Sequence, residues 1–350
     1  MSERQINITV IVTVFNKESD LPRCLQSLKD QTDRQFYTVV IDDGSSDQSI
    51  EILRKWEGTQ ANGSLLIQTH SGVSAARNLA LSLVQTDYVV FLDGDDSLTE
   101  NAVEILNREI CQEPCDLIIY GISHLLSHGN TYNSKCMNAL YASREEIKNH
   151  FTDLWNTGLM YSACNKMFRM DLIRDHKIAF PQLDFGEDIM FCQEYLKQCC
   201  SLHMLPYVLY RYTYHKSGSL SSQYRVDLFE RRVEEHEQML SFFDEMNVPQ
   251  KESSEYLSRR HIERIVGCIE NEHSPESDLS ISERYRRVQK IVFDPYTQSS
   301  AYQAKQSNWK MKLLILPIRN RQVPIVFLLG ALMSFCRRRL PELFAMLKYR

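Results

Sequence analysis

The stretch Tyr88–Asp96, YVVFLDGDD, places three aspartates and one glycine directly after five apolar residues. An apolar run of this kind predicts a strand that is covered on both faces of a sheet. Carboxylates so close together repel one another, and Gly94 lets the backbone turn tightly enough to bring Asp93 and Asp95 towards one cation. The stretch therefore predicts a buried strand that ends in a cation site.

The segments before this stretch alternate between the patterns of strands and helices. Strand-like runs cover residues 7–15, 36–43 and 64–70, and each is followed by a run with helical spacing of its apolar residues, at 19–32, 48–56 and 72–84. This order predicts an α/β fold with a doubly wound, mostly parallel sheet and right-handed crossovers. Polar residues follow all four strands, so we expect them at the carboxyl edge of the sheet, where ligands bind in such folds.

Length and composition exclude several classes of protein. With 350 residues, 43% of them hydrophobic, the chain can bury a substantial core. The net charge of −5 argues against a protein that binds nucleic acid with its whole surface. The ten cysteines are scattered, form no zinc pattern and follow no secretory signal, so we expect reduced thiols in a cytosolic protein.

The chain divides by sequence pattern into three parts. Residues 1–222 hold the strand and helix alternation, a further strand near 116–122, a capped helix at 143–155, a helix at 186–199 and a strand at 207–215. Residues 223–308 are charged and helical, and residues 309–350 form a basic, apolar tail with Glu342 as its only acid. The longest apolar run of the tail, Val323–Cys336, is shorter than the ~20 residues that span a bilayer. The tail therefore predicts either a segment in the interface of an anionic membrane or a helical hairpin packed on protein.

The aspartates that follow Leu92 suit a hard divalent cation. Asp93 and Asp95 can reach one Mn²⁺ or Mg²⁺ ion, which would keep positions open for the phosphates of a substrate. Such an ion offsets the charge of a departing diphosphate, which two acids alone would repel. The alternative is structural, because Asp96 or Ser97 could cap a helix near Thr99–Arg108.

Five segments together resemble bacterial glycosyltransferase family 2. They are VIVTVFNKESDLPRCLQSLKDQT, VVIDDGSSDQS, SGVSAARNLAL, YVVFLDGDD and FGEDIMF, in this order within roughly the first 220 residues. The resemblance implies a nucleotide-sugar-binding domain of the GT-A type, a UDP-sugar donor and transfer with inversion. By contrast, the first strand lacks the glycine-rich loop of dinucleotide-dependent oxidoreductases and of sugar nucleotidyltransferases.

The resemblance also implies roles for donor-binding residues. Thr13 and Phe15 are expected to line the base pocket, and Asp43 is expected to accept a hydrogen bond from the uracil N–H. Arg77 and Asn78 are expected to face the diphosphate and the metal-binding acids.

The segment FGEDIMF is expected to supply the catalytic base. Gly186 permits a sharp turn, and Glu187 and Asp188 begin a helix whose positive end favours carboxylates. By resemblance, Asp188 takes the proton of the acceptor hydroxyl, while Glu187 orients a neighbour or the acceptor. His215 is expected to complete the metal shell, with Arg211 or Lys216 closing over the diphosphate, unless His215 is a solvated loop residue.

These expectations combine into one function and one alternative. The first is an inverting, metal-dependent hexosyl- or N-acetylhexosaminyltransferase that builds a capsule, exopolysaccharide or teichoic-acid precursor at the inner face of the cell membrane. Its partners would be a UDP-sugar, a glycan or lipid-linked acceptor, the membrane through 309–350, and a second copy if it oligomerises. The alternative is an inactive sugar-nucleotide-binding or scaffold protein on the same fold, which would lack an acid at position 93, 95 or 188.

Overall fold

The chain separates into two compact units. The computed structural model describes residues 7–59, 62–125, 131–183, 186–214, 224–305 and 309–339. Contacts divide the chain into unit 1, residues 1–217, and unit 2, residues 218–350. The sequence pattern places this boundary at 222/223, and the helices of the 309–350 segment belong to unit 2.

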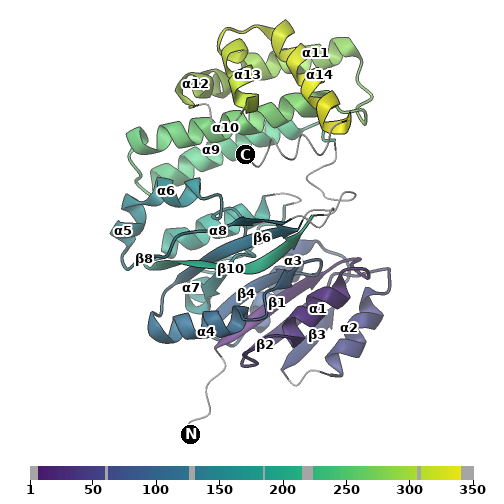
Figure 1. The fold of residues 1–350 in the computed structure, drawn as a ribbon, viewed down its shortest axis with the longest axis vertical. Coiled ribbons are helices and arrows are strands. Elements are labelled where there is room, and N and C mark those ends of the chain that lie inside the picture. The colour runs from purple at the N-terminus through teal and green to yellow at the C-terminus, as the bar shows by residue number, and fades with distance from the viewer. Residues whose placement is uncertain are drawn as a thin grey trace. The chain divides into compact units, whose positions relative to one another are not determined.

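Unit 1 is built around one large sheet (Figure 1). In the described residues its strands are β1 (Ile8–Val14), β2 (Tyr37–Asp42), β3 (Gly63–Ile67), β4 (Tyr88–Asp93), β5 (Ser97–Leu98), β6 (Leu117–Leu125), β7 (Thr131–Ser134), β8 (Ala139–Tyr141), β9 (Lys166–Arg169) and β10 (Leu202–Thr213). They pair in the order β3-β2-β1-β4-β9-β6-β10-β5, with β7 on β6 and β8 on β10.

The first four strands have the expected arrangement. β3, β2, β1 and β4 are parallel neighbours, so their carboxyl ends meet at one edge. β9 departs from the expected parallel pattern, since it lies antiparallel between β4 and β6, and β5, β7 and β8 also pair antiparallel. The sequence of β9, KMFR, is too short to show a period, and only its pairing with distant strands makes it a strand.

Helices cover both faces of this sheet. They are α1 (Leu21–Lys29), α2 (Ser49–Glu57), α3 (Val73–Leu83), α4 (Ala102–Gln112), α5 (Arg144–Asn149), α6 (Phe151–Asn156), α7 (Met170–Asp175) and α8 (Glu187–Gln198). α4 lies on the same face as α1, and the Val103 N–H of α4 donates a hydrogen bond to the side chain of Gln31, just after α1. α3 packs beside the segment that leads to α8, where the Phe180 N–H donates to Asn78. The chain moves from β1 through β2 to β3 in one direction along the sheet and then returns past β1 to β4. Because β-α-β crossovers are right-handed, the reversal places α3 on the opposite face.

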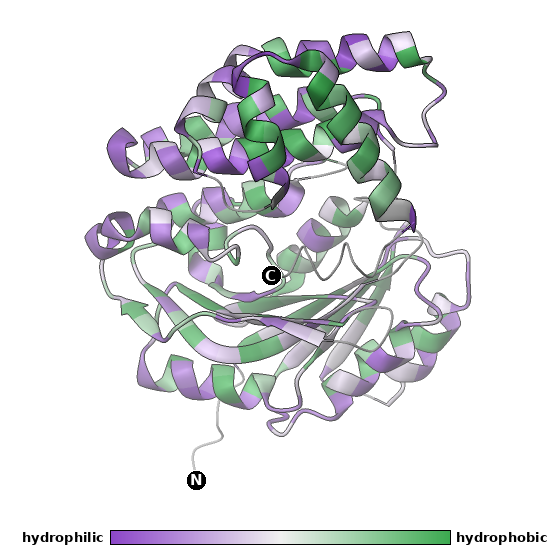
Figure 2. Cartoon of the chain, turned by 45° about the horizontal axis from the view of Figure 1, so that its top comes forward, coloured by the Kyte–Doolittle hydropathy of each residue, from purple (hydrophilic) through white to green (hydrophobic). Residues whose placement is uncertain are grey.

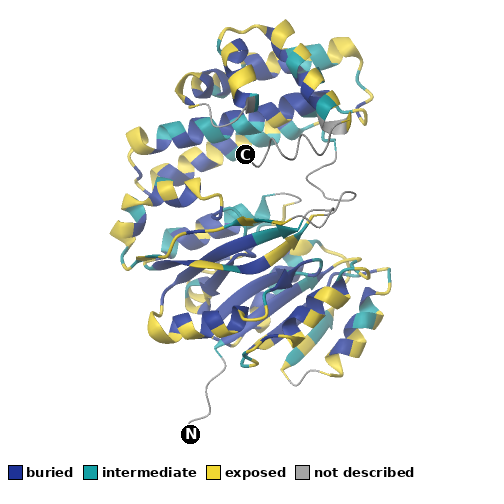
Figure 3. Cartoon of the chain, viewed as in Figure 1, coloured by how far each residue is buried: buried dark blue, intermediate teal, exposed yellow. Residues whose placement is uncertain are grey.

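The predicted capped helix at 143–155 is two short helices. The Ser143 hydroxyl accepts a hydrogen bond from the Glu146 N–H, as the sequence predicts for its start, but the helix ends at Asn149 and α6 begins at Phe151. The central strands are buried on both faces, as Figure 3 shows in dark blue. All ten cysteines are free thiols.

Unit 2 is helical. Its helices in the described residues are α9 (Leu228–Glu245), α10 (Gln250–Glu272), α11 (Ile281–Phe293), α12 (Pro295–Gln303), α13 (Trp309–Arg319) and α14 (Val323–Arg339). Its apolar core gathers side chains of α10 with those of α11, α13 and α14, among them Ile265, Ile291 and Ile315. One side of the predicted tail is therefore packed on protein. Within the described residues, none of the helices has the length and apolar character needed to cross a membrane.

Candidate active site

The polar residues that follow β1 to β4 lie at one edge of the sheet, as the sequence predicts. Thr13 on β1 is the neighbour of Asp93 on β4, and the Gly94 N–H donates to the Thr13 carbonyl at 3.0 Å. A Cβ on Gly94 would lie 3.1 Å from that carbonyl oxygen, so only glycine fits without a shift. This close approach directs the next two aspartates out of the end of β4.

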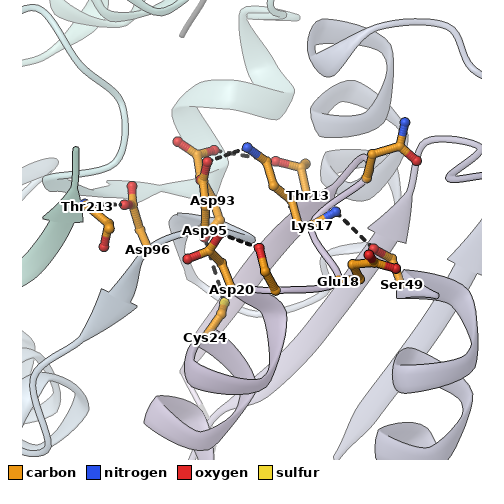
Figure 4. Close-up of polar contacts among 12 residues, drawn as sticks. Thr13, Lys17, Glu18, Asp20, Cys24, Ser49, Asp93, Asp95, Asp96 and Thr213 are labelled. Carbon is orange, nitrogen blue, oxygen red and sulfur yellow. Dashed lines mark hydrogen bonds and ion pairs between the residues drawn. The ribbon is translucent and has the colours of Figure 1, made fainter. Parts of the chain in front are cut away.

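Asp93 and Asp95 carry the carboxylates of the expected cation site. Asp93 Oδ1 accepts hydrogen bonds from Arg77 at 2.9 Å and from the Thr13 hydroxyl at 3.4 Å. Asp95 forms an ion pair with Lys17, which lies two residues beyond Phe15 (Figure 4). Burial raises the pKa of Asp93, which the charge of Arg77 only partly offsets.

The third aspartate has a structural role. Asp96 is buried, and its carboxylate accepts hydrogen bonds from the Tyr210 hydroxyl at 2.7 Å and the Thr213 N–H at 2.8 Å. Figure 4 shows it beside Thr213, at the end of β10. The alternative of a helix cap is wrong, because α4 begins at Ala102 with Asn101 as its N-cap residue. Asp96 instead ties β10 to the turn that carries Asp93 and Asp95.

Arg77 joins the acids at this edge into one network. Its side chain is 4% exposed, and its guanidinium donates to Asp93 at 2.9 Å, to Asp188 at 2.6 Å and to Glu187 at 3.3 Å. Burial alone would lower the pKa of Arg77, but the three carboxylates raise it overall. The alternative of a solvated surface arginine is wrong, because only a paired cation tolerates this degree of burial.

Asp188 is held at both carboxylate oxygens. Oδ1 accepts from Arg77, and Oδ2 accepts from the Ser162 hydroxyl and the Ala163 N–H, each at 3.1 Å. As predicted, Glu187 and Asp188 begin a helix, and Gly186 before it has a φ of 88°, in the left-handed region. Burial and the neighbouring charge of Asp188 raise the pKa of Glu187.

A stack of aromatic rings holds this acid network in place. Phe180 and Phe191 lie face to face at 4.0 Å, and Phe91 of β4 meets both rings edge-on. The Arg77 guanidinium lies over the Phe180 ring at 5.1 Å. Because Phe191 belongs to α8 and Phe91 to β4, the same stack positions the helix of Asp188 against the strand of Asp93.

Phe15 and Asp43, the expected base-binding residues, lie around the ring of His70. Phe15 is 39% exposed, and the imidazole of His70 stacks on it at 4.0 Å and 15°. The Asp43 carboxylate lies 2.8 Å from His70 Nδ1 and accepts a hydrogen bond from Gln68 Nε2 at 2.5 Å. It also accepts hydrogen bonds from the Ser71 and Gly72 N–H groups, each at 2.9 Å. Asp43 thus fastens the loop before α3, while Asp42 caps its own turn at Gly44 and Ser45.

The remaining expected site residues are Asn78 and those near the end of β10. Both ends of the Asn78 amide bond the backbone of Phe180 at 2.8 Å, so this side chain fixes the segment before α8 and faces no phosphate in this arrangement. His215 and Lys216 lie outside the described residues. Arg211, on β10, is exposed and borders a cavity of about 410 Å³ together with Arg23.

Several residues of the site escaped the sequence pattern. Lys17 had a weak signal, since it follows the first strand at the expected edge. Ser162 and Ala163 had none, because they belong to a loop before the unexpected strand β9. That loop is held by Lys166, which is fully buried and donates to the carbonyls of Leu159 and Ser162 at 2.6 and 2.5 Å.

The donor set fits a divalent ion that a substrate completes. In the described residues, no three histidine, cysteine or acidic side chains gather into a protein-only metal site. Two carboxylates, from Asp93 and Asp95, are what a Mg²⁺ or Mn²⁺ ion bound through substrate phosphates requires. Both are partly exposed, at 33% and 20%, and their partners Arg77 and Lys17 are the cations that now offset their charge.

The architecture of unit 1 matches the GT-A fold. The model of glycosyl transferase family 2 matches residues 9–177, which supports a glycosyltransferase of this family. In a fold comparison the chain resembles the crystal structure of Staphylococcus aureus TarS 1–349 in complex with UDP-GlcNAc, with a TM-score of 0.66 and 19% identity, over 95% of this chain and 92% of that one.

Two curated proteins illustrate the sequence similarity. EpsH of Bacillus subtilis, which carries the name of a glycosyltransferase, is 24% identical over 330 residues, 93% of this chain and 94% of its own length. The teichoic acid poly(glycerol phosphate) polymerase of Staphylococcus epidermidis is 32% identical over 193 residues, 54% of this chain and 26% of its own length.

Proposed function

We propose that this protein transfers a sugar from a UDP-sugar to a hydroxyl group of a cell-surface glycan precursor, with inversion at the anomeric carbon. The observation that carries the proposal is the network of Arg77 with Asp93 and Asp188 at the carboxyl edge of a GT-A sheet. It links the acid expected near the donor phosphates to the acid expected to act as base.

Asp188 is the proposed base. Its carboxylate takes the proton of the acceptor hydroxyl, whose oxygen then attacks the anomeric carbon from the side opposite the departing diphosphate. Arg77, Ser162 and the Ala163 N–H restrict the rotation of this carboxylate. One displacement of this kind inverts the configuration and needs no nucleophile from the protein.

The proposed metal ion is Mn²⁺ or Mg²⁺, held by Asp93 and Asp95. When bound, it would neutralise charge on the diphosphate of the donor. Lys17 contacts Asp95 and Arg77 contacts Asp93, so both side chains lie beside the carboxylates that would hold the ion and would add positive charge near the diphosphate.

The proposed donor and acceptor classes rest on the similar proteins. TarS was crystallised with UDP-GlcNAc, which supports a UDP-sugar, and the polymerase of S. epidermidis acts in teichoic acid synthesis, which supports a cell-envelope acceptor. We place the reaction at the inner face of the cell membrane, where such a precursor would be presented. Product analysis with a panel of UDP-sugars, described next, distinguishes hexosyl from N-acetylhexosaminyl donors.

The test compares two neighbouring acids at the start of α8. Asp188→Asn should bind UDP with Mn²⁺ as the wild type does but lose at least about a hundredfold in transfer rate, because it removes the base. Glu187→Gln, the matched control, removes the adjacent carboxylate that also contacts Arg77 and should lose much less. UDP binding is measured by calorimetry and transfer by product analysis with a panel of UDP-sugars. Normal transfer by Asp188→Asn would contradict the assignment.

A further inference from the structure

An apolar stripe runs along the outside of α13 and α14. Its members are large side chains that are between 43% and 68% exposed: Leu313, Leu316, Ile325, Leu328, Leu332 and Phe335. We refer to these six residues as the outer stripe. Figure 2 shows hydrophobic residues along α14, and Figure 3 shows exposed positions between its buried ones.

The opposite sides of the same helices are already used for packing. Met311, Leu314 and Ile318 of α13 and Val326 and Met333 of α14 are almost fully buried in the core of unit 2. At 3.6 residues per turn, the four α14 members of the outer stripe lie within an arc of about 80° that faces away from Val326 and Met333. A helix that is apolar on every side is normally buried on every side. The outer stripe therefore needs a second apolar environment.

The segment that carries the outer stripe has charges of a single sign. Residues 309–339 contain seven lysines and arginines, at 310, 312, 319, 321, 337, 338 and 339, and no aspartate or glutamate. Lys310 is paired with Glu270, while Lys312, Arg321 and Arg339 are exposed. At the turn between the helices, Arg319 and Arg321 lie over the rings of Tyr302 and Phe293, which are themselves exposed. Apolar residues bordered by basic and aromatic ones suit an anionic lipid surface.

The same charge argues against a second copy of this chain as the occupant. A two-fold interface would place the stripe of one molecule on the stripe of the other and bring both sets of basic residues together. Like charges facing each other across an interface oppose association. A lipid surface with negative headgroups supplies the complementary charge, and its acyl region accepts the leucines.

We infer that the outer stripe of α13 and α14 is a docking surface for an anionic membrane, with the leucines in the acyl boundary and the lysines and arginines at the headgroups. This inference rests on the proposed function for its purpose, since it would bring the active site to a membrane-borne acceptor. Vesicle binding needs no sugar donor, so a failure here is distinguishable from a failure of transfer.

The experiment measures co-sedimentation of the full chain with vesicles. Binding should be strong with about one third phosphatidylglycerol, weak with phosphatidylcholine alone, and reduced when salt rises from about 0.1 to 0.5 M. The double variant Leu328→Ser with Leu332→Ser should bind at least about tenfold more weakly, because both side chains leave water on docking. Ile281→Ser is the matched control, since Ile281 is 77% exposed in the same unit but lies on α11.

Folding and self-association are checked on the same samples. Circular dichroism should show the wild-type melting temperature for both variants, because the replaced side chains are more than half exposed. Wild-type vesicle binding by the double variant would overturn the inference. A wild type that is dimeric without lipid, and a double variant that is monomeric, would also overturn it by assigning the stripe to a second copy.

Discussion

Unit 1 and unit 2 bury titratable side chains in opposite ways. In unit 1, Arg77 is nearly inaccessible and stays charged because three carboxylates surround it. In unit 2, His236 and His261 stack at 4.1 Å, and burial lowers their pKa values to about 4 and about 3. Arg77 therefore keeps its charge on burial, whereas these two histidines are neutral when buried.

The difference follows from the partners that surround each buried side chain. A buried charge costs several kcal/mol unless it is paired, and three carboxylates pair with Arg77. The His261 ring nitrogens have no hydrogen-bond partner among the described residues, which only a neutral, packed imidazole tolerates. Arg264 lies close enough to lower the pKa of both histidines further, and the Tyr296 ring meets His236 edge-on.

The largest expected effect comes from breaking the charge network of unit 1. Arg77→Met should lower the free energy of unfolding by about 3–5 kcal/mol, because Asp93, Glu187 and Asp188 would be left without their counter-charge. Urea unfolding followed by circular dichroism measures the loss. Lys290→Met serves as the control, since both side chains of its ion pair with Glu230 are well exposed, at 62% and 45%, and the pair is worth at most about 1 kcal/mol. Equal losses for the two variants would show that burial of Arg77 carries no special weight.

A second effect, of similar total size at pH 5, should appear in unit 2 on acidification. The folded state lowers the pKa of His236 and His261 below the unfolded value of about 6.5, so the unfolded chain binds protons first as the pH falls. Stability should be complete above pH 6.5 and decline below it, by about 2 kcal/mol per histidine at pH 5. Amide hydrogen exchange in α9 and α10 reports the loss within unit 2.

Replacement of both histidines isolates their share of this pH dependence. The double variant His236→Phe with His261→Phe should lose most of the destabilisation between pH 7 and pH 5. His150→Gln, which removes an exposed histidine, should keep it. An unchanged pH dependence in the double variant would mean that other groups, such as buried acids, govern unit 2.

The smallest expected effect concerns His70, which belongs to neither pattern because it is half exposed. The His70 ring stacks on Phe15 and contacts Asp43, the two residues that are expected to bind the uracil base. His70→Ala should therefore tighten UDP binding by about threefold to tenfold, the worth of one stacked, partly solvated pair. Calorimetry with UDP and Mn²⁺ measures it, and Gln68→Ala tests the other donor to Asp43. Weaker binding by His70→Ala would show that the imidazole supports the base instead of competing with it.

The sequence predicted the sheet better than it predicted the contacts of the site. Apolar runs and turn residues were enough to predict that β1 to β4 are parallel and that Asp93 and Asp43 lie at one edge, because parallel strands must end together. Arg77 was expected there only from the family resemblance. The same reasoning missed β9, whose four residues become a strand only between β4 and β6. It left open whether residues 309–350 lie on a membrane or pack on protein, and α13 and α14 share their inner side with the core of unit 2.

By itself, the sequence determined which residue types reach the carboxyl edge, since local periodicity and chain direction decide where each strand ends. Only the tertiary structure decided how they are used there. There, Asp96 is hydrogen-bonded to Tyr210, Asn78 to the Phe180 backbone, and the second oxygen of Asp188 to the Ala163 N–H. These partners lie 25 to 114 positions apart in the chain. Their meeting depends on strand register and helix packing, which no local pattern encodes.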